Sequence, residues 1–108
     1  MPWGARVSTE RIGQGQAFRA DTSSPAYASM AEAMAVAYPG QEMQASGMGG
    51  SIPLCNTLAS LYPETEILLI GLSEPEAQIH AVNESVSPRE LEQLAFAEAL
   101  FLRNYAAG

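Results

Sequence analysis

Apolar residues recur at helical spacing in three parts of the chain, each with a proline near its start. The first helix is predicted to begin at Pro25, because residues 21–24 offer N-cap side chains and proline is favoured at the first helical position. Pro39 and Gly40 end this pattern. The predicted apolar stripe consists of Tyr27, Met30, Met34 and Tyr38.

The second and third helices follow from similar signals. Ser51 is a candidate N-cap with Pro53 in the first turn, and the next proline stops the run. Ser87, Pro88 and Glu90 match a capping box, so the last helix is predicted to begin there. The predicted apolar positions are Leu54, Leu58, Leu61 and Tyr62 in the second helix, and Leu91, Leu94, Ala95, Phe101, Leu102 and Tyr105 in the third.

Three other segments have the patterns of β-strands. Residues 5–12 alternate between small or apolar and polar types, as a half-exposed strand does, and residues 41–46 form a shorter candidate. Residues 66–72 are a continuous apolar run bounded by turn residues, which is typical of a central strand covered on both faces. Helices that alternate with strands at these lengths predict an α/β fold, with helices packed on a mixed, largely parallel sheet.

The composition predicts one small globular domain at most. The chain has 108 residues, of which 47% are hydrophobic and 16% are charged, so it is unlike a disordered chain and has room for one core. Its net charge is -7, it has no lysine, and its five basic residues are scattered arginines. No basic stripe is present to bind nucleic acid or an anionic membrane.

Cysteine usage and hydropathy bear on the compartment. Cys55 is the only cysteine, so an intrachain disulfide is impossible, and a buried thiol in a reducing cytoplasm is predicted. No apolar run approaches the length that spans a bilayer. The first residues lead into a strand-like segment without an entry signal, and we expect the chain to be a piece of a longer protein.

Two motifs carry the candidate chemistry. Gly49, Gly50 and Ser51 precede a predicted helix, where free backbone amides favour a carboxylate or phosphate, although the spacing alone also fits an ordinary tight turn. His80, the only histidine, follows the apolar run and is either a metal ligand or a solvated loop residue. One histidine, one cysteine and one aspartate are too few for a complete hydrolytic site.

Asn83 and Glu84 follow His80 closely, and they are either turn formers or groups that orient an imidazole ligand. The sequence Gly-Gly-Ser-Ile-Pro before an apolar helix, with Ile-His-Ala-Val-Asn-Glu after the apolar run, resembles a known family. The chain resembles the C-terminal part of the co-catalytic zinc metallopeptidases, which include carnosinase-like dipeptidases, glutamate carboxypeptidase, aminoacylase and succinyl-diaminopimelate desuccinylase. The resemblance covers nearly the whole chain, and the dipeptidase branch fits best.

The resemblance implies a role for each motif. His80 matches the last ligand of a dinuclear zinc centre, in which cobalt or manganese could replace zinc. The loop at residues 49–51 matches the one that receives the terminal carboxylate of the substrate, and Asn83 and Glu84 match a pair that supports the ligand. The implied substrates are dipeptides or N-acylated amino acids, and the chain itself holds no catalytic residue.

The same resemblance implies how the chain is divided. Residues 1–21 would be the last strand of a lid domain and the return linker, and residues 22–108 would be the C-terminal part of the catalytic domain. The other zinc ligands, the bridging aspartate and the glutamate acting as general base would belong to a missing N-terminal catalytic segment, so the isolated chain should be inactive. We also expect the isolated chain to form homodimers, because surfaces that would meet the missing segment are then exposed and apolar.

A second hypothesis belongs to a different class of function. The chain is then a non-catalytic α/β module, whose exposed sheet edge and unpaired helix face mediate self-association or the binding of a partner. Metal affinity separates the two hypotheses, because only the first assigns a metal to His80.

Overall fold

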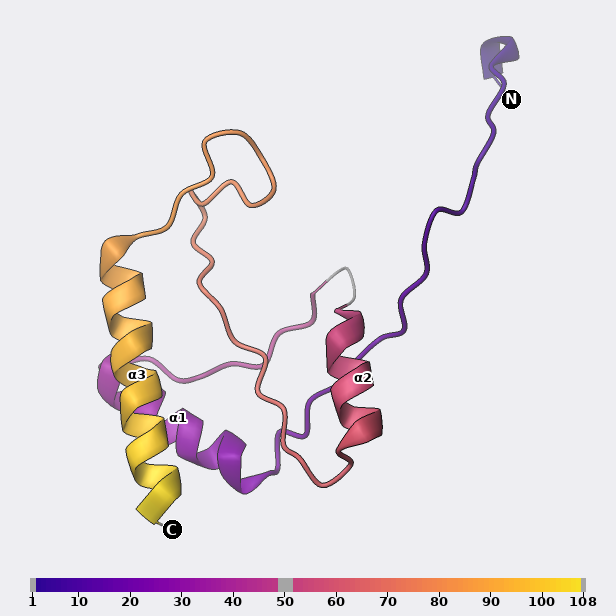
Figure 1. Ribbon diagram of the computed structural model, residues 1–108. Helices are drawn as coiled ribbons and strands as arrows, with labels where there is room; N and C mark the ends of the chain where they lie inside the picture. Colours follow the sequence, from indigo (N-terminus) through magenta and orange to yellow (C-terminus); the bar gives the residue numbers. More distant parts are fainter. Residues whose placement is uncertain (1, 49–51, 108) are drawn as a thin grey trace.

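The computed structural model describes residues 2–48 and 52–107, in which the regular elements are helices (Figure 1). A three-residue 3-10 turn spans Pro2–Gly4. The α-helices are α1 at Pro25–Ala37, α2 at Pro53–Leu61 and α3 at Pro88–Ala107. Long irregular segments connect them, and the N-terminal segment runs away from the rest of the chain.

Helix α1 begins and ends where local signals predict. Ser24 is the N-cap, and its Oγ accepts a hydrogen bond of 3.2 Å from the Tyr27 N–H, which has no acceptor within the helix. Pro25 occupies the first turn. At the other end, the Tyr38 N–H donates to the Met34 carbonyl at 2.8 Å, and a proline follows. The predicted helix is confirmed.

Helix α3 also begins at its predicted cap. The Ser87 Oγ accepts from the Glu90 N–H at 3.4 Å, and the Ser87 carbonyl accepts from the Leu91 N–H at 3.0 Å. The carboxylate of Glu90 lies in the first turn, where it interacts favourably with the helix dipole. In α2, by contrast, the N-cap is Ile52, which makes no side-chain cap hydrogen bond, and the predicted cap Ser51 lies outside the described residues.

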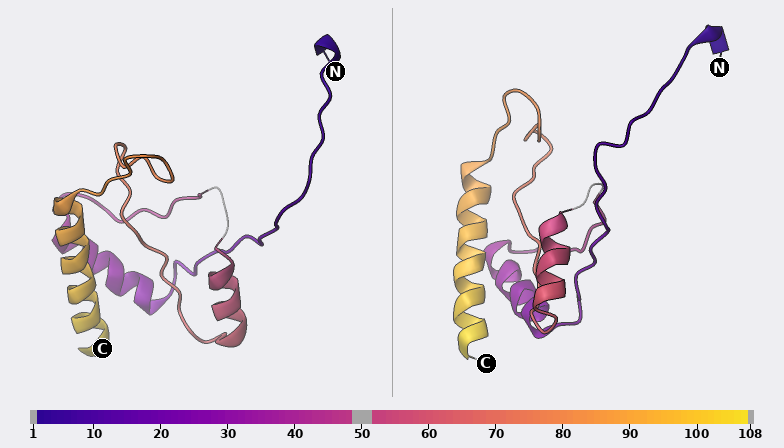
Figure 2. Two further views of the ribbon diagram at one scale, coloured as in Figure 1. Left: turned by 45° about the horizontal axis from the view of Figure 1, so that its top comes forward. Right: turned by 45° about the vertical axis from the view of Figure 1, so that its right-hand side comes forward.

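The core of the described structure is the contact between α1 and α3 (Figure 2). Ala33 of α1 and Ala97 of α3 are both 0% exposed, and side chains this small allow the two helices to approach closely. Met30 is the largest buried side chain of α1. The Gln93 Nε2 adds a hydrogen bond of 3.1 Å to the Ala37 carbonyl, which links the two helices near the end of α1.

The buried faces of these helices differ from the predicted stripes. The buried residues of α1 are Ala26, Met30, Ala33 and Ala37, whereas Tyr27, Met34 and Tyr38 are only half-buried. In α3 the buried residue is Ala97, and the exposed members of the predicted face are Leu91, Ala95, Leu102 and Tyr105. Two helices that cross closely have small side chains at the crossing point. The predicted stripes contain mostly large apolar residues and therefore miss these positions.

Helix α2 lies apart from the other two helices (Figure 2). Within the described residues, α1 and α3 are the one helix pair in contact. Cys55 is the buried residue of α2, and the Asn56 Nδ2 donates to the Gln16 carbonyl at 2.9 Å, which ties α2 to the N-terminal segment. The side of α2 that was predicted to pack is exposed.

The predicted α/β fold is wrong for this chain. No residue in 2–48 or 52–107 is part of a β-strand, so the described structure contains neither the mixed, largely parallel sheet nor the predicted lid strand. A segment becomes a strand only when its N–H and C=O groups pair with a neighbouring strand, and residues 5–12, 41–46 and 66–72 have no such neighbour. Leu69 and Ile70 of the predicted central strand are 53% and 38% exposed.

The chain is also less compact than one small domain. Its radius of gyration is 18.4 Å, whereas a folded domain of this length has a radius of about 13 Å. The buried apolar residues are mostly alanines, and no large side chain is fully buried within the described residues. The structure therefore contains a helix pair with a small core, together with a separate helix and long irregular segments.

Candidate functional site

The loop between α2 and α3 carries the predicted metal ligand, and three backbone hydrogen bonds shape it. The Ala77 N–H donates to the Glu74 carbonyl at 3.0 Å, and the Ala81 N–H donates to the Gln78 carbonyl at 2.9 Å. A third bond of 3.0 Å runs from the Ser85 N–H to the Ala77 carbonyl and closes residues 77–85 into a loop. Ala77 is buried, so the base of this loop is anchored on the chain.

Residues 77–85, here named the His80 loop, have an unusual backbone. Gln78, His80 and Asn83 all adopt left-handed conformations, with φ values of 51°, 64° and 63°. This conformation costs about 1–2 kcal/mol for a residue that is not glycine, although asparagine and histidine adopt it more often than most. Strain of this kind persists only where the surrounding structure holds it, and it is concentrated at functional sites.

The His80 loop presents several polar side chains to solvent. His80, Asn83 and Glu84 are all exposed on this one short loop. A lone imidazole does not make a zinc site, because zinc takes about four ligands. Among the residues that the structure describes, no three His, Cys, Asp or Glu side chains converge to hold a metal ion.

The predicted carboxylate-binding loop, Gly49, Gly50 and Ser51, lies outside the described residues. Its role therefore stays a prediction. Helix α2 begins at Pro53, directly after this loop, and the first amides of a helix have no intrahelical acceptors. The position of the motif before a helix start is thus as predicted, with Ile52 between them as the cap.

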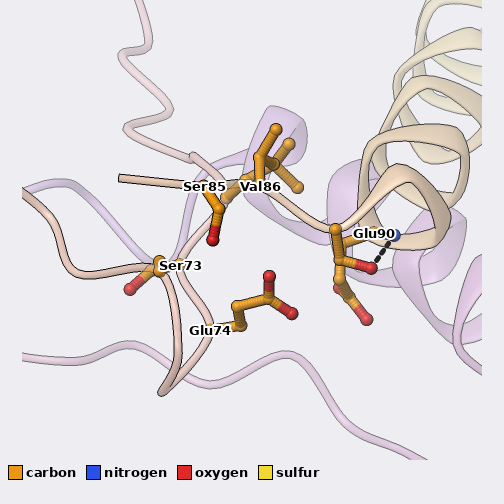
Figure 3. Close-up of a pocket in the computed structure, with 8 residues that line it drawn as sticks. Ser73, Glu74, Ser85, Val86 and Glu90 are labelled. Carbon is orange, nitrogen blue, oxygen red and sulfur yellow. Dashed lines mark hydrogen bonds between the residues drawn. The ribbon is translucent and has the colours of Figure 1, made fainter. Parts of the chain in front are cut away.

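A small cavity lies at the base of the His80 loop (Figure 3). Ser73, Glu74, Ser85 and Glu90 are among the residues that line it, and Glu74 points toward the space between Ser85 and Glu90. Its volume of about 10 Å³ suits one water molecule and excludes a substrate. No local sequence pattern indicates that Glu74 and Glu90 line one cavity, because loop closure is what brings Glu74 beside the start of α3.

Two ionisable groups outside the His80 loop have shifted pKa values. Burial of the Tyr38 phenol, together with the charge and hydrogen bonding of the Glu90 carboxylate, raises the pKa of Tyr38. The pKa of Asp21 is lowered, because its carboxylate accepts hydrogen bonds from the Ser23 hydroxyl at 2.6 Å and the Ser23 N–H at 2.9 Å. Both shifts arise from local packing and turn structure, and neither marks a catalytic group.

Glu66 makes a structural contact that the sequence did not reveal. Its Oε2 accepts a hydrogen bond of 2.6 Å from the Ala26 N–H, where a carboxylate is favoured at the N-terminus of α1. The two residues are 40 positions apart, so no local pattern could pair them. An open cavity of about 450 Å³ beside this contact is also lined by Phe101 and Tyr105, whose rings stack with centroids 5.4 Å apart.

Comparison with known proteins identifies a relative. Over 104 residues, which is 96% of the chain, the sequence is 41% identical to the cysteinylglycine-S-conjugate dipeptidase of Corynebacterium striatum. The chain is similar to the C-terminal portion of this dipeptidase. The predicted resemblance is confirmed, because the match lies in the C-terminal portion of this dipeptidase. No protein-family profile matches the chain, and no solved structure matches it significantly.

The chain spans 23% of the length of this dipeptidase. The comparison thus relates the chain to one portion of this dipeptidase, while the activity in the relative's name belongs to a protein about four times as long. A separate observation concerns membranes: none of the helices in residues 2–48 and 52–107 is both long and apolar enough to cross one.

Proposed function

We propose that this chain is the C-terminal portion of a metal-dependent dipeptidase and that His80 is one of its metal ligands. The observation that carries the proposal is the 41% identity to a cysteinylglycine-S-conjugate dipeptidase over 96% of the chain. The name of this relative specifies S-conjugates of the dipeptide cysteinylglycine as its substrates. We extend this substrate class, together with N-acylated amino acids, to the protein that contains the chain.

The residues present fit a metal centre that is shared with another part of the polypeptide. His80 offers an exposed imidazole, and neutral imidazole is a common zinc ligand. The described residues hold no group of three ligating side chains, so the other ligands of a two-zinc centre would come from the N-terminal catalytic segment. Cobalt or manganese would suit a mixed set of imidazole and carboxylate ligands as well.

Each predicted site residue then has a distinct task. The bound metal pair would supply a water of lowered pKa and a polarised substrate carbonyl. The closed backbone of the His80 loop supports His80, and Asn83 and Glu84 would orient its imidazole in the assembled metal site. The loop at residues 49–51 receives the substrate carboxylate. Because none of these groups acts as the general base, the isolated chain should not catalyse hydrolysis.

Two further parts of the proposal concern organisation and compartment. Residues 1–21 form the return from a lid domain, and the exposed course of most of this segment suits a linker. Residues 22–108 belong to the catalytic domain. We place the protein in the cytoplasm, because Cys55 is a free, buried thiol and cytoplasmic thiols stay reduced.

The test uses the natural protein that carries this sequence, purified with its metal, and a cysteinylglycine S-conjugate as substrate. His80→Ala should lower kcat/KM by at least about 100-fold, because a metal ligand is lost. Gln78→Ala is the matched control, since Gln78 lies in the same loop, is exposed and also has a left-handed backbone. It should leave kcat/KM nearly unchanged.

Circular dichroism of both variants shows whether folding is intact. Full hydrolysis by a folded His80→Ala variant would overturn the assignment of His80 as a ligand. Absence of metal-dependent dipeptide hydrolysis in the unsubstituted protein would overturn the proposed function as a whole.

A further inference from the structure

Helix α2 has an apolar stripe that the described structure leaves partly exposed. Leu54, Leu58 and Leu61 are spaced at i, i+4 and i+7, and at about 100° per residue they fall within roughly 60° of one another around the helix. Their exposed fractions are 62%, 37% and 65%. We name these three residues the α2 leucine stripe.

A different side of α2 makes the contacts with the chain. Cys55 is 5% exposed and Ala59 is half-buried, and both lie beside the α2 leucine stripe rather than on it. The Asn56 side chain bonds to the Gln16 carbonyl, and neither α1 nor α3 touches α2 within the described residues. The contacts of α2 with the chain are thus made by small and polar residues, and the leucines stay partly exposed.

We propose that the α2 leucine stripe docks on an apolar surface of the N-terminal segment of the same polypeptide. This inference rests on the proposed function, since it identifies the surface through which the two portions of the dipeptidase meet. The chain spans 23% of its relative, so about three quarters of that length has no counterpart here and is available as the partner. The stripe immediately follows the predicted carboxylate-binding loop, so docking would also fix the start of α2.

Size and charge favour a linked segment over a second copy of the chain. A stable interface between separate proteins buries about 800 Å² on each partner. The exposed area of the three leucines is smaller than this. A covalently linked partner needs less area, because linkage gives it an effective concentration of the order of millimolar. Two copies of the chain would also repel each other, since each has a net charge of -7.

The test measures how fast a cysteine in the stripe reacts with iodoacetamide in the natural, full-length protein. Leu61→Cys places the thiol in the stripe, and Ser60→Cys is the matched control on the neighbouring exposed position. Labelling is read at each site by tandem mass spectrometry, which separates it from Cys55. We expect Leu61→Cys to react at least tenfold more slowly than Ser60→Cys in the native protein and equally fast in denaturant.

Equal rates in the native protein would overturn the proposal, as would a natural product with no segment beyond these 108 residues. Protection that disappears on dilution would assign the stripe to a second copy and likewise overturn it. Leu54→Cys gives an independent reading if Leu61→Cys does not fold. Dipeptide hydrolysis is assayed on the unsubstituted protein, so a protected stripe without hydrolysis would support docking while it overturns the dipeptidase function.

Discussion

Enlarging one alanine in the α1–α3 contact should destabilise the helix pair, whereas the same change two residues away should not. Ala33 is 0% exposed, so the three additional carbon atoms of a leucine have no free space there. Overpacking of a buried position costs about 1–3 kcal/mol. Ala35 lies on the exposed side of the same helix, where the larger side chain extends into solvent.

The size of the expected destabilisation depends on burial, because the difference in helix propensity between alanine and leucine is small. Alanine and leucine are both strong helix formers, and their propensities differ by only a few tenths of a kcal/mol. We therefore expect Ala33→Leu to lower the free energy of unfolding by about 2 kcal/mol relative to Ala35→Leu. This difference corresponds to a change of roughly 30-fold in the unfolding equilibrium constant.

Urea unfolding followed by far-ultraviolet circular dichroism measures this difference. The transition midpoint of Ala33→Leu should be lower than that of Ala35→Leu, with similar denaturant slopes. Ala97→Leu, at the other fully buried alanine, should behave like Ala33→Leu. Equal midpoints for Ala33→Leu and Ala35→Leu would refute the conclusion that close contact between α1 and α3 forms the core.

Three further predictions concern a cap, the His80 loop and pH. Ser24→Ala removes the acceptor for the Tyr27 N–H and should lower stability by about 1 kcal/mol in urea unfolding, while an unchanged midpoint would argue against the cap. Gln78→Gly should raise stability by up to about 1 kcal/mol in the same assay, since relief of left-handed strain exceeds the added flexibility of glycine, and a loss would contradict this. Tyr38 has a raised pKa, first from burial and then from Glu90, so its contribution to stability is fully present below pH 10 and is lost as the pH rises through the folded value. Urea unfolding from pH 9 upward should show this loss in the unsubstituted protein and a smaller one in Tyr38→Phe, and identical pH profiles would refute it.

Helix boundaries were predictable because their signals are local. Ser24 and Ser87 each precede a proline and accept a hydrogen bond from an N–H three residues later. These interactions involve neighbours in sequence, so a single sequence contains them completely. The buried faces were less predictable, because the α1–α3 crossing selects Ala33 and Ala97, which carry little hydrophobic signal of their own.

The sheet was predicted wrongly because strand formation depends on distant partners. The apolar run at residues 66–72 has the composition of a buried strand, yet Leu69 and Ile70 are exposed and no described segment pairs with it. The composition of a segment shows only that it is compatible with a β-strand. Whether the strand forms depends on pairing with a neighbouring strand. The contact between Glu66 and the Ala26 N–H is likewise non-local and had no sequence signal.

The candidate site was predictable in part. Sequence alone located His80, Asn83 and Glu84 after the apolar run, and the structure places them together on one closed loop. The left-handed backbone of His80 was not foreseen, because it depends on the closure between Ser85 and Ala77. His80 can act as a metal ligand only together with other ligating side chains. This chain spans 23% of its relative and does not show them.

The most direct test of the account is the metal content of the natural protein that carries this chain, measured by mass spectrometry of the elements in unsubstituted protein and in His80→Ala. The account predicts about two metal ions per polypeptide in the unsubstituted protein. It predicts the loss of at least one of them in a folded His80→Ala variant, because this histidine is a ligand. The same metal content in both proteins would contradict the central claim that His80 belongs to the metal centre of a dipeptidase.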